Sequence, residues 1–269
     1  MPGTENGRQK TENPPMPKLS VTVIALNQEA HLGPCLTSVA WADEIVVVDT
    51  GSQDRTLEVA RQFTDRVFTV PWQGYGRTKN FALDQARGEW AFSLDTDERV
   101  SPALKEEILR VLKDNGPLAG YRVPRKNFFG GRWIRHLGWY PDYTLRLFRR
   151  QQGRFKEREV HEEVVVNGPL GTLSAPLEHY SYHDLAEYAA RQDRYARLAA
   201  REMAKEGRRP FPGELAWRPF FTFLNLFFLK RGFLEGPLGF SLALHSSRYN
   251  FLKYHYLREL TRGGESHDH

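Results

Sequence analysis

Two aspartates flank a single residue directly after a short apolar run. Asp95 and Asp97 lie on either side of Thr96 and follow Trp90–Leu94, which we expect to be a buried strand. Hard divalent cations prefer oxygen ligands, and Mg²⁺ commonly takes one or two carboxylates together with substrate phosphates. Asp95 and Asp97 therefore predict a Mg²⁺ or Mn²⁺ site that clamps a diphosphate and offsets the charge of a departing nucleotide. A solvated acidic turn is the alternative interpretation.

Two further segments carry groups that suit a nucleotide. Asp49 ends the β-branched run Glu44–Val48 and precedes a glycine turn, where its carboxylate suits a base or ribose; a strand-to-helix turn with Asp54 as a helix cap is the alternative. The loop Gly74–Gly76 leads into a helix start with Arg77 and Lys79, and helix N-termini and cations both favour phosphate. Neither segment has the glycine spacing of a dinucleotide-binding fold or the Gly-Lys-Ser/Thr of a phosphate-binding loop.

These side chains must be positioned by a repeated strand–helix unit. From about residue 19 to residue 113, short apolar runs alternate with amphipathic runs. The alternation predicts an α/β fold with a mainly parallel central sheet, helices on both faces and right-handed crossovers. Ligands of such sheets bind at the carboxyl ends of the strands, so the loops after the strands should line the site. The expected strands are Leu19–Leu26, Glu44–Val48, Arg66–Val70 and Trp90–Leu94, and the expected helices are Glu29–Val39, Asp54–Phe63, Arg77–Arg87 and a helix that opens at Ser101-Pro102.

The pattern changes beyond about Gly116. Tyr121–Gly153 is dense in aromatic and basic residues. His161–Val166 and Leu170–Leu173 predict a β-hairpin, because Asn167-Gly168 between them adopts the positive φ angles of a tight turn.

The C-terminal part reads as helical. Asp184–Gly207 predicts a long helix with a capping box at its start and a glycine stop at its end. Residues 208–269 predict a further helical region, in which Arg218 and Lys230-Arg231 edge a strongly apolar segment. Basic residues beside aromatic residues suit the surface of an anionic bilayer, and a helix pair packed on the catalytic domain is the equal alternative.

Composition sets limits on the class of protein. The chain has 269 residues, a net charge of +5 and one cysteine, Cys35, which excludes an intrachain disulfide and a multi-cysteine zinc site. Residues 1–18 are polar and read as a disordered leader rather than a secretory signal. We also expect no membrane-spanning segment. The basic balance attracts anions in general, and we expect no nucleic-acid partner.

Several segments together resemble the family-2 glycosyltransferases of the GT-A fold. They are LSVTVIALNQEAHLGPCLTSV, ADEIVVVDTGSQDRTLEVA and GRTKNFALDQARGEWAFSLDTDERVSP. The later segments GYRVPRKNFFGGRWIRHLGWYPDYTLRLFRR, REVHEEV and LEHYSY are similar to the WaaE-like subgroup of lipopolysaccharide core glucosyltransferases. The similarity runs from about Lys18 to Leu260, which is nearly the whole chain.

The resemblance implies a reaction and a set of site residues. The reaction is metal-assisted, inverting transfer of a hexose from a nucleoside-diphospho-sugar, UDP-linked in our expectation, to a cell-envelope glycan or lipopolysaccharide core acceptor. An inverting transfer needs one base for the acceptor hydroxyl, and Glu162 is the first choice, with Asp142 second. The residues implied to bind the nucleotide sugar are Asn27, Glu29, Asp49, Lys79, Asp95 and Asp97, of which Asp95 and Asp97 hold the metal.

Two positions depart from the family pattern near the base. Thr50 stands where many members have a second aspartate, and Ala25-Leu26-Asn27 stands where the first strand usually ends in Thr-x-Asn or Ser-x-Asn. The asparagine of the family pattern is therefore present as Asn27. The departures at Thr50 and Ala25 weaken the expectation of a contact with uracil.

The sequence predicts a catalytic domain over residues 19–207, with a nucleotide half to about residue 115 and an acceptor half after it. We expect a cytoplasmic protein, peripheral on the cytoplasmic face of the inner membrane. Two rival functions remain. A sugar nucleotidyltransferase would need a glycine-rich basic loop after the first strand, where this chain has Asn27–His31. A non-catalytic sugar- or lipid-binding module would not need Asp95, Asp97 or Glu162.

Overall fold

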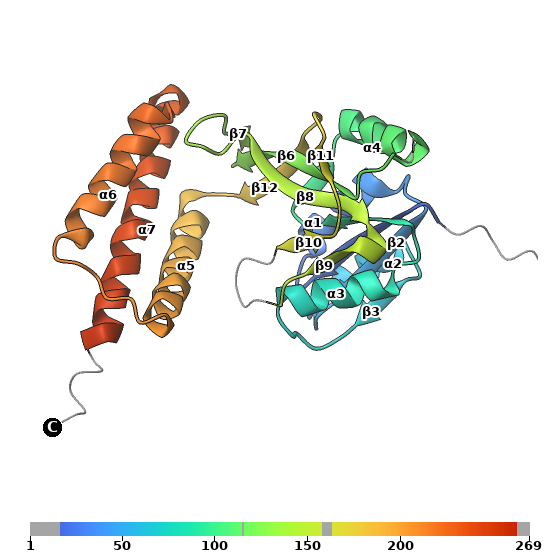
Figure 1. The fold of residues 1–269 in the computed structure, drawn as a ribbon, viewed down its shortest axis with the longest axis horizontal. Helices are drawn as coiled ribbons and strands as arrows, with labels where there is room; N and C mark the ends of the chain where they lie inside the picture. The colour runs from blue at the N-terminus through green and yellow to red at the C-terminus, as the bar shows by residue number, and fades with distance from the viewer. Residues whose placement is uncertain (1–16, 115, 158–162, 263–269) are drawn as a thin grey trace, which may run out of the picture. The chain divides into compact units, whose positions relative to one another are not determined.

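The computed structural model describes residues 17–114, 116–157 and 163–262 (Figure 1). The chain forms two compact units, and each is assembled from separate segments of the sequence. The first unit comprises Met1–Thr96, Val111–Gly120 and Arg146–Leu170, and the second comprises Asp97–Arg110, Tyr121–Leu145 and Gly171–His269.

The sheet of the first unit has the order β3-β2-β1-β4-β8. β1 runs parallel to both β2 and β4, β2 runs parallel to β3, and the C-terminal half of β8 pairs antiparallel with β4. Almost every side chain of β1, β2 and β4 is buried, as expected for strands covered on both faces. The strands are β1 (Leu19–Ala25), β2 (Glu44–Asp49), β3 (Val67–Thr69), β4 (Trp90–Leu94) and β8 (Asp142–Arg149).

Three helices cross over between these strands. Right-handed crossovers place α1 and α2 on one face, because the chain moves from β1 through β2 to β3 in one direction, and place α3 on the other face as it returns to β4. Ala82 and Ala86 of α3 pack against Val46 and Val48 of β2. The predicted ends of these strands and helices agree with the structure within two residues. The helices are α1 (Glu29–Val39), α2 (Thr56–Arg61) and α3 (Tyr75–Gln85), and α4 (Pro102–Asp114) follows β5.

The predicted hairpin around Asn167-Gly168 is wrong. β10 (Val164–Val166) pairs antiparallel with β9 (Gly153–Phe155), which follows η1 (Arg150–Gln152), and β11 (Leu170–Thr172) pairs with β6 instead. Pro169 explains the difference, because it lacks the N–H that a residue after the turn would donate across a two-residue hairpin.

The second unit contains the remaining strands. β6 runs parallel to β12 and antiparallel to the short β7, and β12 runs antiparallel to β5. Phe129, Ile134 and Leu137 from the β6–β7 region form a core with Tyr188 and Leu242 from the helices. The strands are β5 (Glu98–Val100), β6 (Gly120–Phe129), β7 (Arg132–Trp133) and β12 (Leu177–Tyr182).

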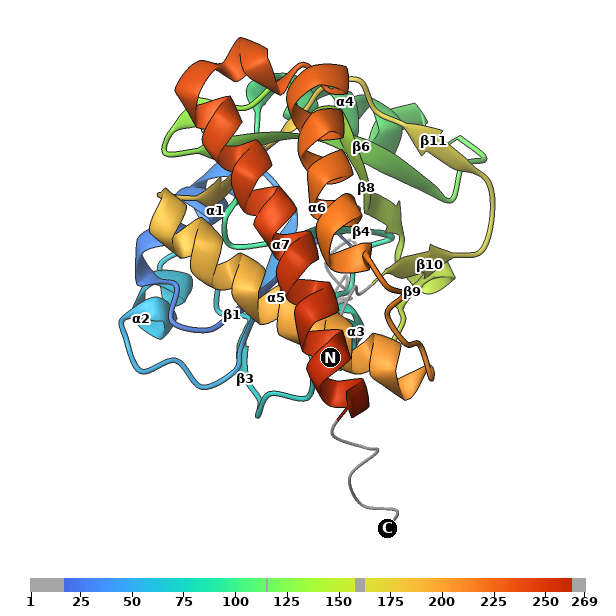
Figure 2. The same cartoon turned by 90° about the vertical axis from the view of Figure 1, so that its left-hand side faces the viewer.

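The C-terminal part of the second unit is helical, as predicted. Figure 2 shows α5, α6 and α7 side by side, and α7 packs against both of the others. Asp184 caps α5 by accepting a hydrogen bond from the backbone N–H of Glu187 (2.8 Å), so the predicted capping residue is confirmed. Among the described residues, no helix combines the length and the apolar character that crossing a bilayer requires. The elements are α5 (Leu185–Lys205), α6 (Glu214–Leu224), η2 (Asn225–Leu229), η3 (Gly232–Glu235) and α7 (Gly236–Arg262).

Candidate active site

The carboxyl ends of three parallel strands meet at one edge of the first sheet. The register pairs Ala25 of β1 with Asp49 of β2, and Val23 of β1 with Leu94 of β4, the residue before Asp95. Asp49 and Asp95 therefore flank the end of β1, about 10 Å apart, because neighbouring strands are about 4.8 Å apart. The predicted position of the site at this edge follows from the strand order.

Asp95 lies between two buried cations. Lys79 Nζ donates to Asp95 Oδ1 (2.9 Å), and Arg146 Nη2 donates to Asp95 Oδ2 (2.5 Å). The side chains of Lys79 and Arg146 are almost fully buried, whereas about a third of the Asp95 side chain is exposed. Burial raises the pKa of Asp95, but the charges of Arg146 and Lys79 outweigh it and hold that pKa well below its usual range. Asp95 is therefore ionised and is paired with two buried cations.

Asp49 organises the turn after β2. Its Oδ2 accepts hydrogen bonds from the backbone N–H groups of Gly51 (2.9 Å) and Ser52 (3.0 Å), and its Oδ1 accepts from the Ser52 hydroxyl. Asp49 is fully buried, and Gly51 has a φ of +108°, which favours glycine. In the structure Asp49 therefore shapes this turn, and its contact with a nucleotide stays a prediction.

The loop after β1 is fastened to this turn. Asn27 has a left-handed backbone (φ 53°), donates its N–H to Ser52 Oγ (2.8 Å) and accepts at Oδ1 from the N–H of Gln53 (2.8 Å). Glu29 Oε2 accepts from the N–H of Arg55 (3.1 Å). Asn27, Glu29 and Asp49 thus all hold the loops at the ends of β1 and β2, and their contacts with a nucleotide stay predictions.

Asp97 begins the second unit and faces a histidine. Its Oδ2 lies 3.4 Å from His179 Nε2, and its carbonyl accepts from the N–H of Tyr180 (2.8 Å). Asn127 donates Nδ2 to the Trp139 carbonyl (2.8 Å), so its Oδ1 faces His179 Nδ1 at 2.7 Å. His179 thus contacts the Asn127 amide oxygen through Nδ1 and lies toward Asp97 through Nε2.

The two base candidates have different standing. Asp142 Oδ2 accepts from Arg125 Nε (3.0 Å) and Nη2 (2.5 Å), and Arg125 also lies 3.5 Å from the buried Glu98. If Asp142 accepts a proton at Oδ2, its ion pair with Arg125 must therefore weaken. Glu162 lies outside the described residues, so both assignments stay predictions.

The residues near Asp97 suit a hard cation that also binds phosphate. Over the described ranges, no group of three or more His, Cys, Asp or Glu side chains forms a metal cage. Asp97 Oδ2 and His179 Nε2 supply two donor atoms, and Mg²⁺ typically completes its shell with water and substrate phosphates. Lys79 and Arg146 each bind one carboxylate oxygen of Asp95. Asp95 can therefore bind a metal ion directly only if it releases one of these two cations.

Sequence reasoning missed Arg146 and His179 as site residues. Arg146 is a charged residue inside the otherwise apolar stretch Leu145–Phe148, and an arginine at a buried strand position indicates an acidic partner. His179 lies within LEHYSY, a segment that carried the family resemblance but no assigned role. Its partner Asp97 is remote in the chain, which is why local pattern did not single it out.

Comparison with known proteins places the chain in a family. Residues 20–167 match the family described as "Glycosyl transferase family 2". A lipopolysaccharide core biosynthesis glycosyltransferase, LpsC of Rhizobium meliloti (strain 1021), is 34% identical over 246 residues, covering 87% of this chain and 89% of LpsC.

Solved structures of low identity are also similar. TarS of S. aureus in complex with UDP-GlcNAc is 18% identical with a TM-score of 0.46, over 92% of both chains. Glucosyl-3-phosphoglycerate synthase of Mycobacterium tuberculosis, in complex with Mg²⁺ and UDP, is 17% identical with a TM-score of 0.44, over 73% of this chain and 82% of that one. The family match spans more than half of the chain and the LpsC relative spans most of it. This protein is therefore a glycosyltransferase of family 2, with the α/β fold expected of the GT-A type.

Proposed function

We propose that this glycosyltransferase moves a hexose from a UDP-sugar to a lipopolysaccharide core acceptor, with metal assistance and inversion at the anomeric carbon. The observation that carries the proposal is the pair of carboxylates after β4: Asp95 is held ionised by two buried cations, and Asp97 faces a histidine nitrogen. The similarity to LpsC supports the class of acceptor.

The first unit binds the nucleotide in this proposal. Asn27, Glu29 and Asp49 form the rim at the ends of β1 and β2, where family members contact base and ribose. Lys79 and Arg146 add two positive charges beside Asp95, and cations in a partly dry site attract a diphosphate strongly. A leaving UDP would thus develop its charge next to preorganised cations.

The metal belongs beside Asp97. Asp97 and His179 would supply the protein donor atoms for Mg²⁺ or Mn²⁺, and Asp95 would join them only by releasing Lys79 or Arg146. When bound, the cation neutralises charge on the diphosphate as the sugar leaves. Asn127 orients the His179 ring through Nδ1, as the partners of metal-binding histidines commonly do.

A carboxylate must take the proton of the acceptor hydroxyl. Glu162 is the proposed base, and Asp142 is the second candidate, which would first have to weaken its ion pair with Arg125. Glu162→Gln and Asp142→Asn separate the two assignments, since replacing the base removes transfer while donor binding persists. The acceptor is lipid-linked in this proposal, so the protein works as a peripheral protein on the cytoplasmic face of the inner membrane.

Metal-dependent hydrolysis of a panel of nucleotide sugars tests the proposal. Purified protein should release UDP from one UDP-sugar with Mn²⁺ or Mg²⁺, and Asp97→Ala should lower the rate by about 100-fold or more, because the cation loses its main ligand. His179→Ala should raise the metal concentration needed by about 10- to 100-fold. The matched control is His255→Ala on α7, which should leave both quantities unchanged.

Two results would contradict the proposal. One is equal turnover by Asp97→Ala and the unmodified protein. The other is neither turnover nor nucleotide binding across the panel, which would favour a sugar- or lipid-binding role. Binding without turnover would direct the search to the acceptor.

A further inference from the structure

Four large apolar side chains project from the turn between α6 and α7. Phe228 and Leu229 precede the turn, and Phe233 and Leu234 follow it. Their exposed fractions are 53%, 79%, 48% and 53%, although residues of this type usually lie in the core. We call these four residues the apolar tip. Large apolar side chains exposed so close together in the chain are typical of an interaction surface.

The backbone under the apolar tip is held rigidly. Glu235, which is buried, accepts hydrogen bonds from Arg132 Nη2 (2.7 Å) and from the N–H groups of Arg135 (3.0 Å) and His136 (3.2 Å). Lys230 accepts at its carbonyl from the N–H of Leu137 (2.9 Å). Because these contacts anchor the turn, the apolar side chains are presented outward instead of collapsing onto the core.

Close packing under the turn adds to this rigidity. A Cβ on Gly232 would lie 2.6 Å from Leu137 Cδ2, and a Cβ on Gly239 would lie 2.0 Å from the Gly232 carbonyl. Both positions therefore require glycine. The tip is preorganised, so docking it costs little further ordering of the chain.

Two cations lie within the apolar tip and a third lies further along α7. Lys230 and Arg231 lie between its two apolar pairs and are exposed, and Arg248 is exposed on α7. The acidic residues nearest in sequence, Glu214 and Glu235, are buried in ion pairs. The exposed face is consequently apolar and cationic together.

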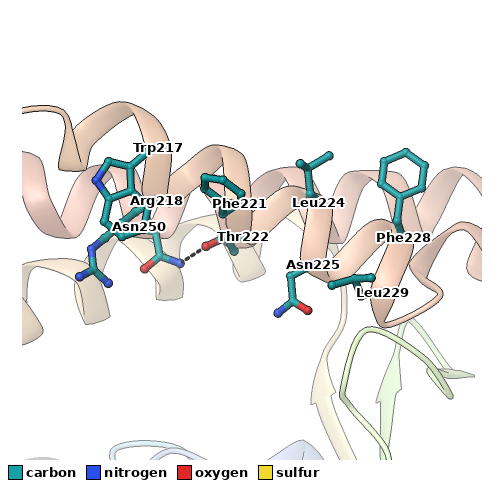
Figure 3. A pocket seen from close by; sticks show the side chains of 9 residues that line it. All are labelled: Trp217, Arg218, Phe221, Thr222, Leu224, Asn225, Phe228, Leu229 and Asn250. Carbon is teal, nitrogen blue, oxygen red and sulfur yellow. Dashed lines mark hydrogen bonds between the residues drawn. The ribbon is translucent and has the colours of Figure 1, made fainter.

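The apolar surface continues from the tip along α6. Figure 3 shows Trp217, Phe221, Leu224 and Phe228 along one side of the α6–η2 helix. Their spacing is that of one helical stripe. They line a groove with a volume of about 610 Å³, which also has Arg218 at its border. Arg218 lies over the Trp217 ring (4.6 Å), so an aromatic side chain and a cation meet there as well.

We infer that the apolar tip and the α6 stripe form a docking surface for a bilayer that contains anionic phospholipids. Leucine and aromatic side chains enter the boundary of the acyl chains, while Lys230 and Arg231 meet the phosphate groups. A protein partner or a second copy of this chain would also cover apolar side chains. The cations between the apolar pairs favour an anionic surface, because a second copy would bring like charges together. The inference concerns how the enzyme reaches a lipid-linked acceptor and so adds to the proposed function.

Vesicle sedimentation of the full-length protein tests the inference. The probes are vesicles of phosphatidylcholine alone and vesicles in which phosphatidylglycerol replaces part of it. We expect the protein to sediment with the anionic vesicles and to be released by salt. The double variants Phe228→Ser/Leu229→Ser and Lys230→Glu/Arg231→Glu should each lower the partition coefficient by about tenfold or more. The matched control is Leu109→Ser/Lys113→Glu on α4, an exposed apolar and basic pair outside this surface.

The outcomes separate this inference from the transferase proposal. Protein that hydrolyses the donor but stays in the supernatant with both vesicle types would overturn the docking surface alone. So would tip variants that sediment like the unmodified protein, or a dimer that the tip variants convert to monomers without any vesicle binding. Sedimentation without donor turnover would instead count against the transferase proposal. Thermal unfolding checks that each variant is folded. The salt dependence of vesicle binding is measured on the unmodified protein and so tests the inference without any variant.

Discussion

At the scale of single residues, the site depends on a carboxylate that two cations keep ionised. Lys79 and Arg146 are nearly buried and both contact Asp95. Removing the negative charge would leave two cations in a poorly hydrated place. The pairing that we propose to serve a diphosphate therefore also contributes to folding.

Asp95→Asn should lower the free energy of unfolding by about 2–3 kcal/mol. The loss is smaller than the ~3–5 kcal/mol typical of a fully buried pair, because water reaches part of the Asp95 carboxylate. Urea unfolding at neutral pH measures the loss. The control is Asp84→Asn, whose exposed ion pair with Arg154 should contribute less than about 1 kcal/mol. Equal effects of the two substitutions would refute this account of Asp95.

The loss caused by Asp95→Asn should depend on pH. The charges of Lys79 and Arg146 hold the pKa of Asp95 in the folded protein below its usual range, despite the opposing effect of burial. The unfolded chain has an aspartate pKa of about 3.9, so the stabilisation is present above about pH 4 and is lost as the pH falls toward the folded pKa. The difference between the two proteins should thus shrink in acid and stay constant from about pH 5 to 8.

At the scale of elements, the start of α3 is fixed by close backbone contact. The sequence suggested that the Gly74–Gly76 loop cradles phosphate. In the structure, a Cβ on Gly76 would lie 2.2 Å from the Lys156 carbonyl oxygen, so this glycine permits α3 to lie against the segment that follows β9. The position of Lys79 one turn later in α3 depends on that contact.

Gly76→Ala should destabilise the protein by about 2 kcal/mol or more, because backbone on both sides must move. It should also weaken donor binding, since Lys79 moves with α3. Gly33→Ala in α1 is the matched control: its Cβ would lie 3.6 Å from Val59 Cγ1, an ordinary contact, and alanine favours helix by about 0.5–1 kcal/mol. Thermal unfolding and donor titration of both variants measure the effects, and a neutral Gly76→Ala would rule out the packing argument.

At the scale of the whole molecule, the proposed nucleotide residues and the proposed docking surface belong to different units of the chain. Asn27, Asp49, Lys79 and Asp95, which we propose to bind the nucleotide, belong to the first unit, whereas the apolar tip belongs to the second together with Asp97 and His179. The chain carries a net charge of +5, and exposed charges act over about 10 Å at moderate salt. Salt should therefore affect the two activities differently.

Transfer to an acceptor in anionic vesicles should fall several-fold as ionic strength rises from about 0.05 M to about 0.5 M, because counterions screen the contact between the basic face and the lipid phosphates. Hydrolysis of the donor in free solution should change much less, since Lys79 and Arg146 are shielded from solvent. Parallel assays over one salt series measure both rates. An identical decline of the two would mean that salt acts on the site itself.

Much of the first unit was predictable from the sequence alone. Hydrophobic periodicity is local, so apolar runs such as Trp90–Leu94 and the helices between them indicated a parallel α/β sheet. The strand order then put Asp49 and Asp95 at one edge, as expected. The resemblance to family 2 rested on the same segments and is confirmed by the family match over residues 20–167.

Other features were decided only by the tertiary structure. Arg146 and His179 reach Asp95 and Asp97 from strands far along the chain, and no local spacing records such pairings. The hairpin predicted around Asn167-Gly168 was wrong, because pairing of β10 with β9 and of β11 with β6 replaced the local turn. The sequence by itself determined which segments form strands and helices and which residue types could do chemistry. Only the fold decided which charges meet, because ion pairs and strand partners form between segments that are distant in the sequence.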